Sequence, residues 1–184
     1  MKKLLPNLMT STRICLGTYL LFYILGSQKN TVFIAFVFVL AFLSDYFDGK
    51  TARLLKVESD FGKVFDVMAD IYFVFAMYFV FAICGIIRMY VAVLVVVYFA
   101  FFLFSSLFVC RKKAVRPTFI YDSTGRVAAA LIYVFPLFIY ILQSSMRLDY
   151  YLYVATFIEV CILIIVLLST LIRFHCLKRM LLEN

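Results

Sequence analysis

Long apolar runs separated by short polar segments dominate the pattern of residues along this chain. An α-helix rises about 1.5 Å per residue, so about 20 apolar residues are needed to cross the hydrocarbon layer of a bilayer. We expect six such spans, at Ile14–Ser27, Thr31–Leu55, Gly62–Cys84, Ile87–Cys110, Gly125–Gln143 and Asp149–Arg173. The first run is short for a span, and we expect it to extend back into Thr10–Arg13 or to tilt. The pattern therefore predicts an all-α, polytopic membrane protein of six transmembrane helices, with residues 1–184 in a single domain.

The segment before the first span has a different pattern. Met1–Arg13 mixes leucines with basic and polar residues, which is typical of a short amphipathic helix on a membrane surface. The apolar run after it leads directly into further spans, so we expect no cleavable signal peptide.

Composition and charge place the chain in a membrane and orient it. The chain is 66% hydrophobic with a mean hydropathy of +1.06, which excludes an ordinary globular protein. With a cytoplasmic N-terminus, fifteen of the eighteen Lys and Arg residues fall inside, and Lys29, Arg88 and Arg147 fall outside. This bias predicts that both termini are cytoplasmic. The net charge of +8 suits anionic headgroups or phosphate substrates. Because the basic residues lie in short loops beside the membrane, we expect no nucleic-acid partner.

Four aspartates interrupt the apolar pattern of the second and third spans. Insertion scales put the cost of such an acid at the bilayer centre at about 2.5–3.5 kcal/mol. Because each helical residue advances by about 100°, Asp45 and Asp48 share one face, and Asp66 and Asp70 share one stripe of the next helix. If the two stripes face each other, the four carboxylates converge in a hydrated cavity.

Converging carboxylates cannot all stay ionised unaided. Divalent cations resolve this repulsion, and all-oxygen ligands suit Mg²⁺ or Mn²⁺ better than zinc. Two such ions can clamp a phosphate, and a remaining carboxylate can act as a general base. A calcium-binding EF-hand is excluded because the spacing lacks its alternating ligands. We therefore expect a phosphate-handling site with two metal ions.

Small and basic residues extend the acidic pattern at fixed spacings. The full motif consists of Asp45, Asp48, Gly49, Ala52, Arg53, Gly62, Asp66 and Asp70. It resembles the complete motif of the CDP-alcohol phosphatidyltransferases, and the six-span layout resembles the rest of that family. The resemblance implies transfer of a phosphatidyl group from a CDP-linked lipid, such as CDP-diacylglycerol, to a small alcohol with release of CMP. It also implies a homodimer in the plasma (inner) membrane of a prokaryote, with its active site open to the cytoplasm.

The family pattern implies a role for each residue of the motif. The implied metal ligands are Asp45, Asp48, Asp66 and Asp70. Asp70 is also implied as the catalytic base on the attacking hydroxyl. The residues implied to line the cytidine-diphosphate pocket are Gly49, Ala52, Arg53 and Gly62.

The acceptor alcohol is indicated by the N-terminal pattern P-N-x2-T-x2-R at residues 6–13. This pattern resembles the glycerophosphate-accepting branch of the family, so Asn7 and Thr10 are candidates to bind the donor's phosphates or headgroup. A helix cap at the membrane surface is their alternative role. That branch continues Asp-Pro-x-Ala-Asp-Lys, whereas this chain has Val67 and Ile71 at the proline and lysine positions. Glycerol 3-phosphate is the expected acceptor, and inositol, inositol phosphate and serine remain alternatives.

A phosphorylated acceptor needs positive charge, which one long cytoplasmic loop and its borders supply. The candidate acceptor-binding residues are Lys112, Lys113, Arg116 and Arg126. A pair of arginines can hold a phosphate bidentately. The alternative is that these cations meet anionic lipid headgroups.

Two other classes of protein fit the same aspartates. A divalent-cation transporter would need polar residues along several spans, whereas here they cluster at the inner ends of the second and third. A catalytically silent scaffold that binds CDP-lipid remains an alternative.

Glu159, within the sixth span, is a functional candidate by its position alone. The five dispersed cysteines indicate small packing residues, and His175 indicates a surface residue.

Overall fold

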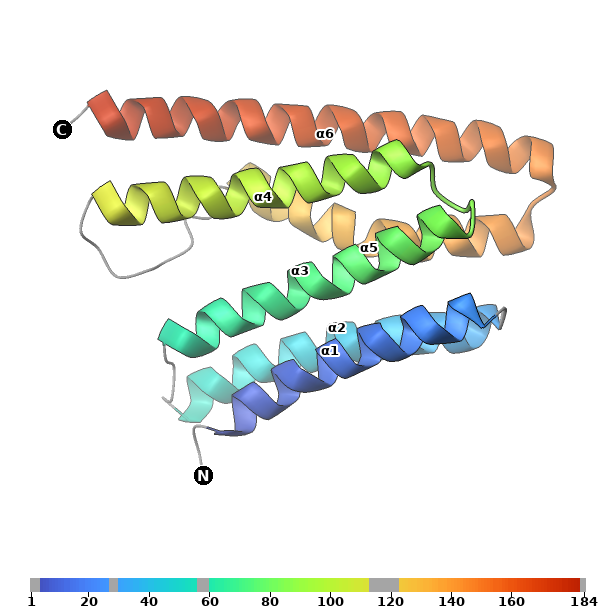
Figure 1. Ribbon diagram of the computed structural model, residues 1–184, viewed down its shortest axis with the longest axis horizontal. Helices are drawn as coiled ribbons and strands as arrows, with labels where there is room; N and C mark the ends of the chain where they lie inside the picture. Colours follow the sequence, from blue (N-terminus) through green and yellow to red (C-terminus); the bar gives the residue numbers. More distant parts are fainter. Residues whose placement is uncertain (1–3, 27–29, 56–59, 113–122, 183–184) are drawn as a thin grey trace. The chain divides into compact units, whose positions relative to one another are not determined.

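The structure is a computed structural model that describes residues 4–26, 30–55, 60–112 and 123–182. Side chains are described at residues 10–26, 30–44, 62, 64–108 and 124–178. This part of the chain is all-α, as the sequence predicts (Figure 1). The helices are α1 (Leu4–Leu25), α2 (Thr31–Leu55), α3 (Asp60–Ile83), α4 (Met89–Lys112), α5 (Ser123–Ser145) and α6 (Leu148–Leu182).

The first helix differs from the expected pair of a surface helix and a separate span. α1 runs without a break from Leu4 to Leu25, so the expected extension into Thr10–Arg13 is confirmed. A separate amphipathic helix is not present there. Pro6 does not end α1, because the first turn of a helix has no intrahelical partner for its N–H groups.

The described helices differ in the length of their apolar stretches. Four are long and apolar enough to cross a membrane, over Val64–Ile83, Met89–Phe108, Thr124–Ser145 and Leu148–Lys178. α2 has a shorter apolar stretch, Thr31–Ser44, before its more polar last turns. The count of six spans stays a prediction.

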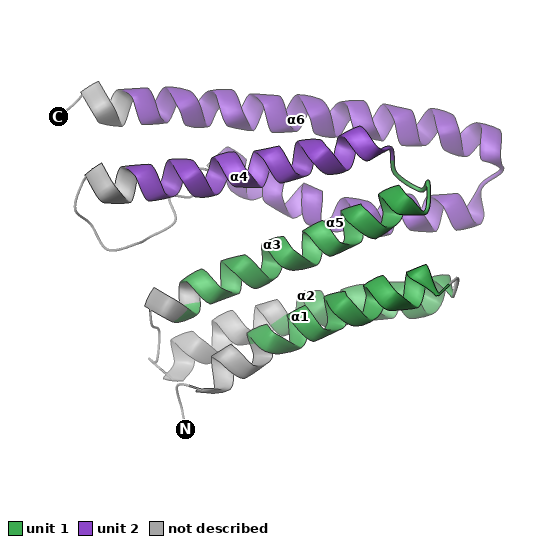
Figure 2. Cartoon of the chain, viewed as in Figure 1, with its two compact units in different colours: residues 1–87 green, residues 88–184 purple. Residues whose placement is uncertain are grey.

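The chain forms two compact units, residues 1–87 and residues 88–184 (Figure 2). In the first unit, α1 packs against both α2 and α3. Figure 1 shows that the beginning of α1, the end of α2 and the beginning of α3 lie at the same end of this unit. The candidate motif therefore lies at one end of one unit. A single domain over the whole chain stays a prediction.

Close packing holds α1 against α3. A Cβ atom added at Gly17 would lie 3.1 Å from the ring of Phe73, so any larger residue at this position would require the ring to shift slightly. Phe73 is fully buried, and its ring meets that of Phe38 on α2 edge-on at 5.2 Å. The glycine and the two rings thus join all three helices.

The end of α3 is fixed by Gly85, whose φ of 71° lies in the left-handed region. The N–H of Ile86 donates to the carbonyl of Phe81 at 2.8 Å, and the N–H of Gly85 donates to that of Ala82 at 3.1 Å. These two bonds form a Schellman cap, which satisfies the last carbonyls of the helix.

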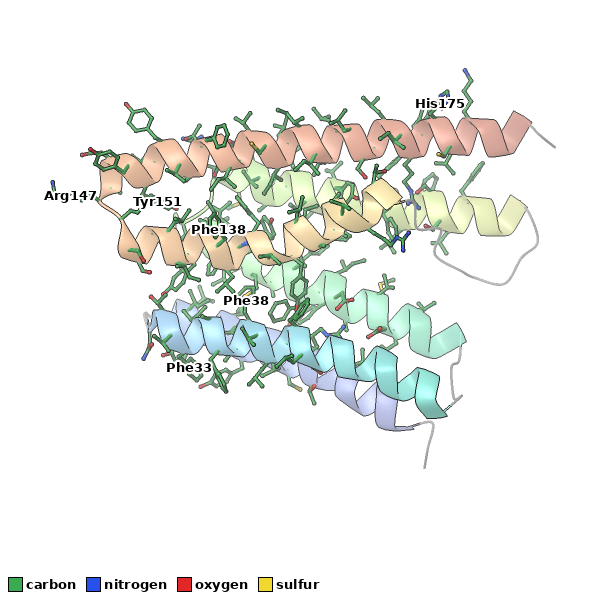
Figure 3. All side chains as sticks on the ribbon, turned by 180° about the vertical axis from the view of Figure 1, so that it is seen from behind. Phe33, Phe38, Phe138, Arg147, Tyr151 and His175 are labelled. Carbon is green, nitrogen blue, oxygen red and sulfur yellow. The ribbon has the colours of Figure 1, made fainter. Side chains whose placement is uncertain are left out.

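In the second unit, α6 packs against α4 and α5. Ile132 and Ile139 of α5 are almost fully buried, whereas Tyr153 and Phe157 of α6 are largely exposed. Outward apolar side chains of this kind suit contact with lipid tails. Figure 3 shows Arg147 near the α5–α6 connection and the exposed His175 toward the other end of α6.

Candidate functional site

Two side chains of α1 meet the two described aspartates of the motif. Thr10 and Arg13 are three residues apart and therefore share one face of α1. Arg13 Nη1 donates to Oδ1 of Asp66 at 3.2 Å and also to Oδ1 of Asp70. Thr10 Oγ1 donates to the same Asp66 oxygen at 3.5 Å. The carboxylates of one α3 stripe thus converge on one cationic nitrogen.

Burial differs across this cluster. The Arg13 side chain is 0% exposed, whereas those of Asp66 and Asp70 are 35% and 37% exposed. A buried arginine is costly unless it is paired and hydrogen-bonded. The two aspartates supply that pairing, and each keeps part of its side chain open to a ligand.

The same helix also contacts α2 directly before the other acidic pair. Thr12 Oγ1 and Ser44 Oγ form a hydrogen bond of 3.3 Å. Ser44 is followed immediately by Asp45 in the chain. Both halves of the predicted motif therefore adjoin α1, which contacts α3 through Thr10 and Arg13 and contacts α2 through Thr12.

Several predicted site residues lie outside the described side chains. The backbone of α2 is helical through Asp45, Asp48, Gly49, Ala52 and Arg53, as the motif requires. Their side chains are outside the described residues, so the convergence of four carboxylates stays a prediction.

The remaining predicted residues are distributed over both units. Asn7 lies in the first turns of α1, and Gly62 lies in the first turn of α3. Lys112 is the last residue of α4, and Arg126 is an exposed residue in the first turn of α5. Lys113 and Arg116 lie outside the described residues. The acceptor-binding role of these four cations stays a prediction.

Sequence reasoning missed the position of Arg13 in this site. The sequence alone indicates only that Arg13 is one of the basic residues expected on the cytoplasmic side and the last residue of P-N-x2-T-x2-R. Its three-residue spacing from Thr10 was the available signal, since it places both on one helical face. Its burial between α1 and α3 depends on the tertiary contact, which no local pattern reports.

The described side chains supply two carboxylates of the kind that binds a divalent metal; no group of three or more His, Cys, Asp or Glu residues lies together among them, so the metal site stays a prediction. Asp66 and Asp70 are close enough to contact one cationic atom, and carboxylate oxygens are the ligands that Mg²⁺ and Mn²⁺ prefer. The partly exposed sides of these carboxylates are where such an ion would reach them.

A second charged cluster lies in the unit of residues 88–184. Glu159 on α6 is 4% exposed and pairs with Arg88 Nη1 at 3.2 Å. Tyr90 donates its hydroxyl to the same carboxylate at 2.9 Å, and Arg88 Nη2 donates to Thr156 at 3.0 Å. The structure therefore supplies the partners of Glu159, and pairing accounts for this acid in an apolar helix.

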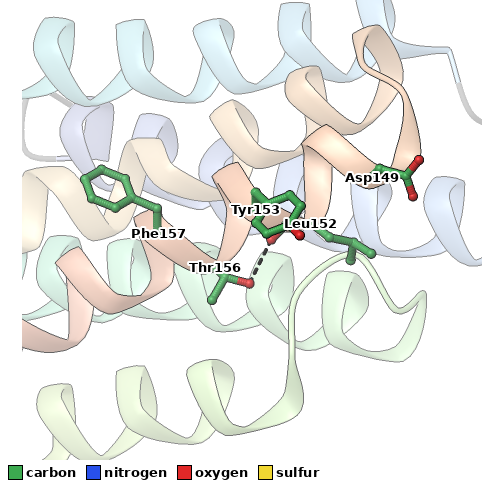
Figure 4. A pocket seen from close by; sticks show the side chains of 5 residues that line it. All are labelled: Asp149, Leu152, Tyr153, Thr156 and Phe157. Carbon is green, nitrogen blue, oxygen red and sulfur yellow. Dashed lines mark hydrogen bonds between the residues drawn. The ribbon is translucent and has the colours of Figure 1, made fainter.

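A pocket on α6 borders this cluster (Figure 4). Its lining residues are Asp149, Leu152, Tyr153, Thr156 and Phe157. Thr156 belongs to both features, but its hydroxyl also donates to the carbonyl of Leu152 at 2.7 Å within α6. The pocket is lined from one helix and has an apolar majority, which suits contact with lipid.

A buried arginine also joins α6 to α4. Arg173 Nε donates to Ser105 at 2.6 Å, and its Nη2 donates to Ser106 at 2.7 Å and to the carbonyl of Phe102 at 3.3 Å. The guanidinium carbon lies 4.4 Å from the centre of the Phe102 ring. This arginine fixes one end of α6 against α4.

A family model matches most of the chain. The family model described as CDP-alcohol phosphatidyltransferase matches residues 3–172. The chain belongs to this family. The match includes α1, so Thr10 and Arg13 lie within the family region together with the aspartates.

Curated relatives resemble shorter parts of the chain. A CDP-diacylglycerol–glycerol-3-phosphate 3-phosphatidyltransferase of Rickettsia typhi is 44% identical over 70 residues, which are 37% of this chain and 39% of the relative. A CDP-diacylglycerol–serine O-phosphatidyltransferase of Helicobacter pylori is 38% identical over 68 residues, which are 37% of this chain and 28% of the relative. The matched segments thus span less than half of each relative. No solved structure shows a significant match.

Proposed function

We propose that this protein transfers a phosphatidyl group from CDP-diacylglycerol to glycerol 3-phosphate and releases CMP. The observation that supports this most directly is the pair of converging, partly exposed carboxylates, Asp66 and Asp70, in a chain of this family. The similarity to the Rickettsia typhi protein and the P-N-x2-T-x2-R pattern favour glycerol 3-phosphate as the acceptor.

The chemistry that we propose for the chain's own residues begins at Asp70. Its carboxylate takes the proton of the acceptor hydroxyl, whose oxygen forms a bond to the phosphorus of the phosphatidyl group. The bond from that phosphorus to the CMP oxygen breaks, and CMP leaves with the electron pair. A correctly placed general base contributes a factor of about 10²–10⁴ to such a step.

The donor is bound by residues around this base in our proposal. The residues that we propose to line the cytidine-diphosphate pocket are Asn7, Thr10, Gly49, Ala52, Arg53 and Gly62. The metal ligands that we propose are Asp45, Asp48, Asp66 and Asp70, which would hold two Mg²⁺ or Mn²⁺ ions. Bound metal would neutralise the charge of the diphosphate.

The acceptor side of the proposal uses the basic residues around the loop between α4 and α5. The phosphate of glycerol 3-phosphate would be bound by Lys112, Lys113, Arg116 and Arg126.

We further propose that the protein is a homodimer in the inner membrane of a prokaryote, with its active site facing the cytoplasm. The positive-inside bias supports this orientation.

Serine is a second candidate acceptor, which the similarity to the Helicobacter pylori protein favours. The missing proline and lysine at positions 67 and 71 also weaken the match to the glycerophosphate-accepting branch. Serine and glycerol 3-phosphate differ in charge, so a direct competition separates them.

The test is CMP release from CDP-diacylglycerol by the purified protein with Mg²⁺ or Mn²⁺. Glycerol 3-phosphate, serine, inositol and inositol phosphate are supplied one at a time. We expect CMP with glycerol 3-phosphate and its loss on chelation of the metal. CMP with serine alone would replace the proposed acceptor, and no CMP with any acceptor would contradict the proposed reaction.

A further inference from the structure

We propose that Arg13 is a positioning residue that holds Asp66 and Asp70 in the arrangement in which a divalent cation binds them. This inference rests on the proposed function. It adds a residue of α1 to a site whose expected ligands all come from α2 and α3.

Arg13 contacts both carboxylates through one nitrogen atom. A single nitrogen, Arg13 Nη1, donates to Oδ1 of Asp66 at 3.2 Å and to Oδ1 of Asp70. The two carboxylates lie one helical turn apart, where like charges repel. A shared guanidinium offsets this repulsion and fixes the separation of the two groups.

Arg13 and the two aspartates differ in their exposure to solvent. Arg13 is fully enclosed, whereas Asp66 and Asp70 are 35% and 37% exposed. The guanidinium therefore contacts the carboxylates from the enclosed side, and about a third of each aspartate side chain is exposed. Arg13 acts on the ligand through the two aspartates.

Thr10 supports the same arrangement of the aspartates. Its hydroxyl donates to the Asp66 oxygen that Arg13 also contacts, at 3.5 Å. Thr10 and Arg13 form one face of α1, and Gly17 holds that helix close to α3. The position of the acidic pair is thus set by the α1–α3 contact. Partners that orient metal ligands in this way typically change metal affinity about 10–100-fold when they are removed.

The test measures Mn²⁺ binding directly, without turnover. The full-length wild-type protein and the variants Arg13→Gln and Arg13→Lys are titrated with Mn²⁺, and the free ion is followed by electron paramagnetic resonance. Arg173→Gln is the matched control, because it removes a buried arginine that binds Ser105 and Ser106 of α4.

We expect Arg13→Gln to weaken Mn²⁺ binding about 10–100-fold. Arg13→Lys keeps the charge but lacks the planar guanidinium, so it should restore part of the affinity. Arg173→Gln should bind Mn²⁺ like the wild type. If Arg13→Gln does not yield folded protein, as judged by helix content and gel filtration, the Arg13→Lys comparison decides.

Unchanged Mn²⁺ binding in the Arg13 variants would overturn the inference and leave the proposed function intact. Tighter binding would also overturn it, since Arg13 would then compete with the metal for the carboxylates. A wild-type protein that binds no Mn²⁺ and releases no CMP would contradict the proposed function itself.

Discussion

At the scale of single residues, the described site consists of charged groups that satisfy one another across α1 and α3. Arg13 is enclosed and pairs with Asp66 and Asp70, which remain partly exposed. Each residue alone would be costly in an apolar helix, because an unpaired buried charge loses its hydration. Because the three residues are paired, they form a polar cluster in which the two carboxylates are stabilised and stay partly exposed.

Asp70→Asn tests the proposed base. The amide keeps the shape of the side chain but cannot take a proton, so we expect turnover to fall by a factor of about 10²–10⁴. The measurement is the rate of CMP release, with CDP-diacylglycerol binding measured in parallel. Asp149→Asn, an exposed acid in the first turn of α6, is the control. Near-normal turnover in Asp70→Asn would refute the role of Asp70.

Arg126→Ala tests the acceptor side. Arg126 is exposed in the first turn of α5. Removing a guanidinium that binds the acceptor phosphate should raise the KM for glycerol 3-phosphate several-fold and leave the KM for CDP-diacylglycerol nearly unchanged. Arg126→Lys should keep part of the affinity, because it retains the charge. A change confined to the donor KM would place Arg126 at the nucleotide instead.

At the scale of elements, α1 is the helix that organises the first unit. It packs on α2 and α3 and contributes Thr10, Thr12 and Arg13 to their polar ends. Its own sequence predicts a short span with a surface segment in front of it. The continuous helix instead places Thr10 and Arg13 of that segment beside Asp66 and Asp70.

Gly17→Leu tests the approach of α1 to α3. A Cβ at this position would lie 3.1 Å from the Phe73 ring, so the ring must shift, and the rest of the leucine side chain needs further space between the two helices. We expect a loss of stability of about 1–3 kcal/mol, which is typical of an overpacked core. Thermal unfolding followed by circular dichroism measures the effect, and the Mn²⁺ affinity should fall with it. Val39→Leu on α2, at a half-exposed position, is the control. Wild-type stability in Gly17→Leu would show that the approach is looser than the structure indicates.

At the scale of the whole molecule, the family match over residues 3–172 includes parts of both units. Polar clusters occur in each unit, and each is internally paired. The first contains the candidate site, and the second contains Glu159 with Arg88 and Tyr90. The pKa of Arg88 is raised above its usual value by the hydrogen bond to Tyr90 and by the charge of Glu159. The surroundings of Arg88 thus favour its charged form.

Glu159→Gln tests whether this second cluster serves stability. The amide removes the charge that pairs with Arg88, so we expect a modestly lower melting temperature. The rate of CMP release per folded molecule should not change. Asp149→Asn on the same helix serves as the control, since Asp149 is exposed. A loss of turnover in folded Glu159→Gln would assign Glu159 a functional role.

The sequence by itself determined the helical class, the membrane character and the family motif. These follow from local properties: the length of apolar runs, the placement of basic residues and the fixed spacing of the aspartates. The span is predicted even though Pro136 lies within α5, because the apolar run continues on both sides of this proline.

Only the tertiary structure decided which residues surround Asp66 and Asp70. The contact between Arg13 and these aspartates joins residues more than fifty positions apart, and the pairing of Arg88 with Glu159 joins residues seventy-one apart. Helical periodicity states which residues share a face, but it does not state which helix that face will meet. That choice depends on the packing of whole helices, as at Gly17 and Phe73, and it places Arg13 beside Asp66 and Asp70.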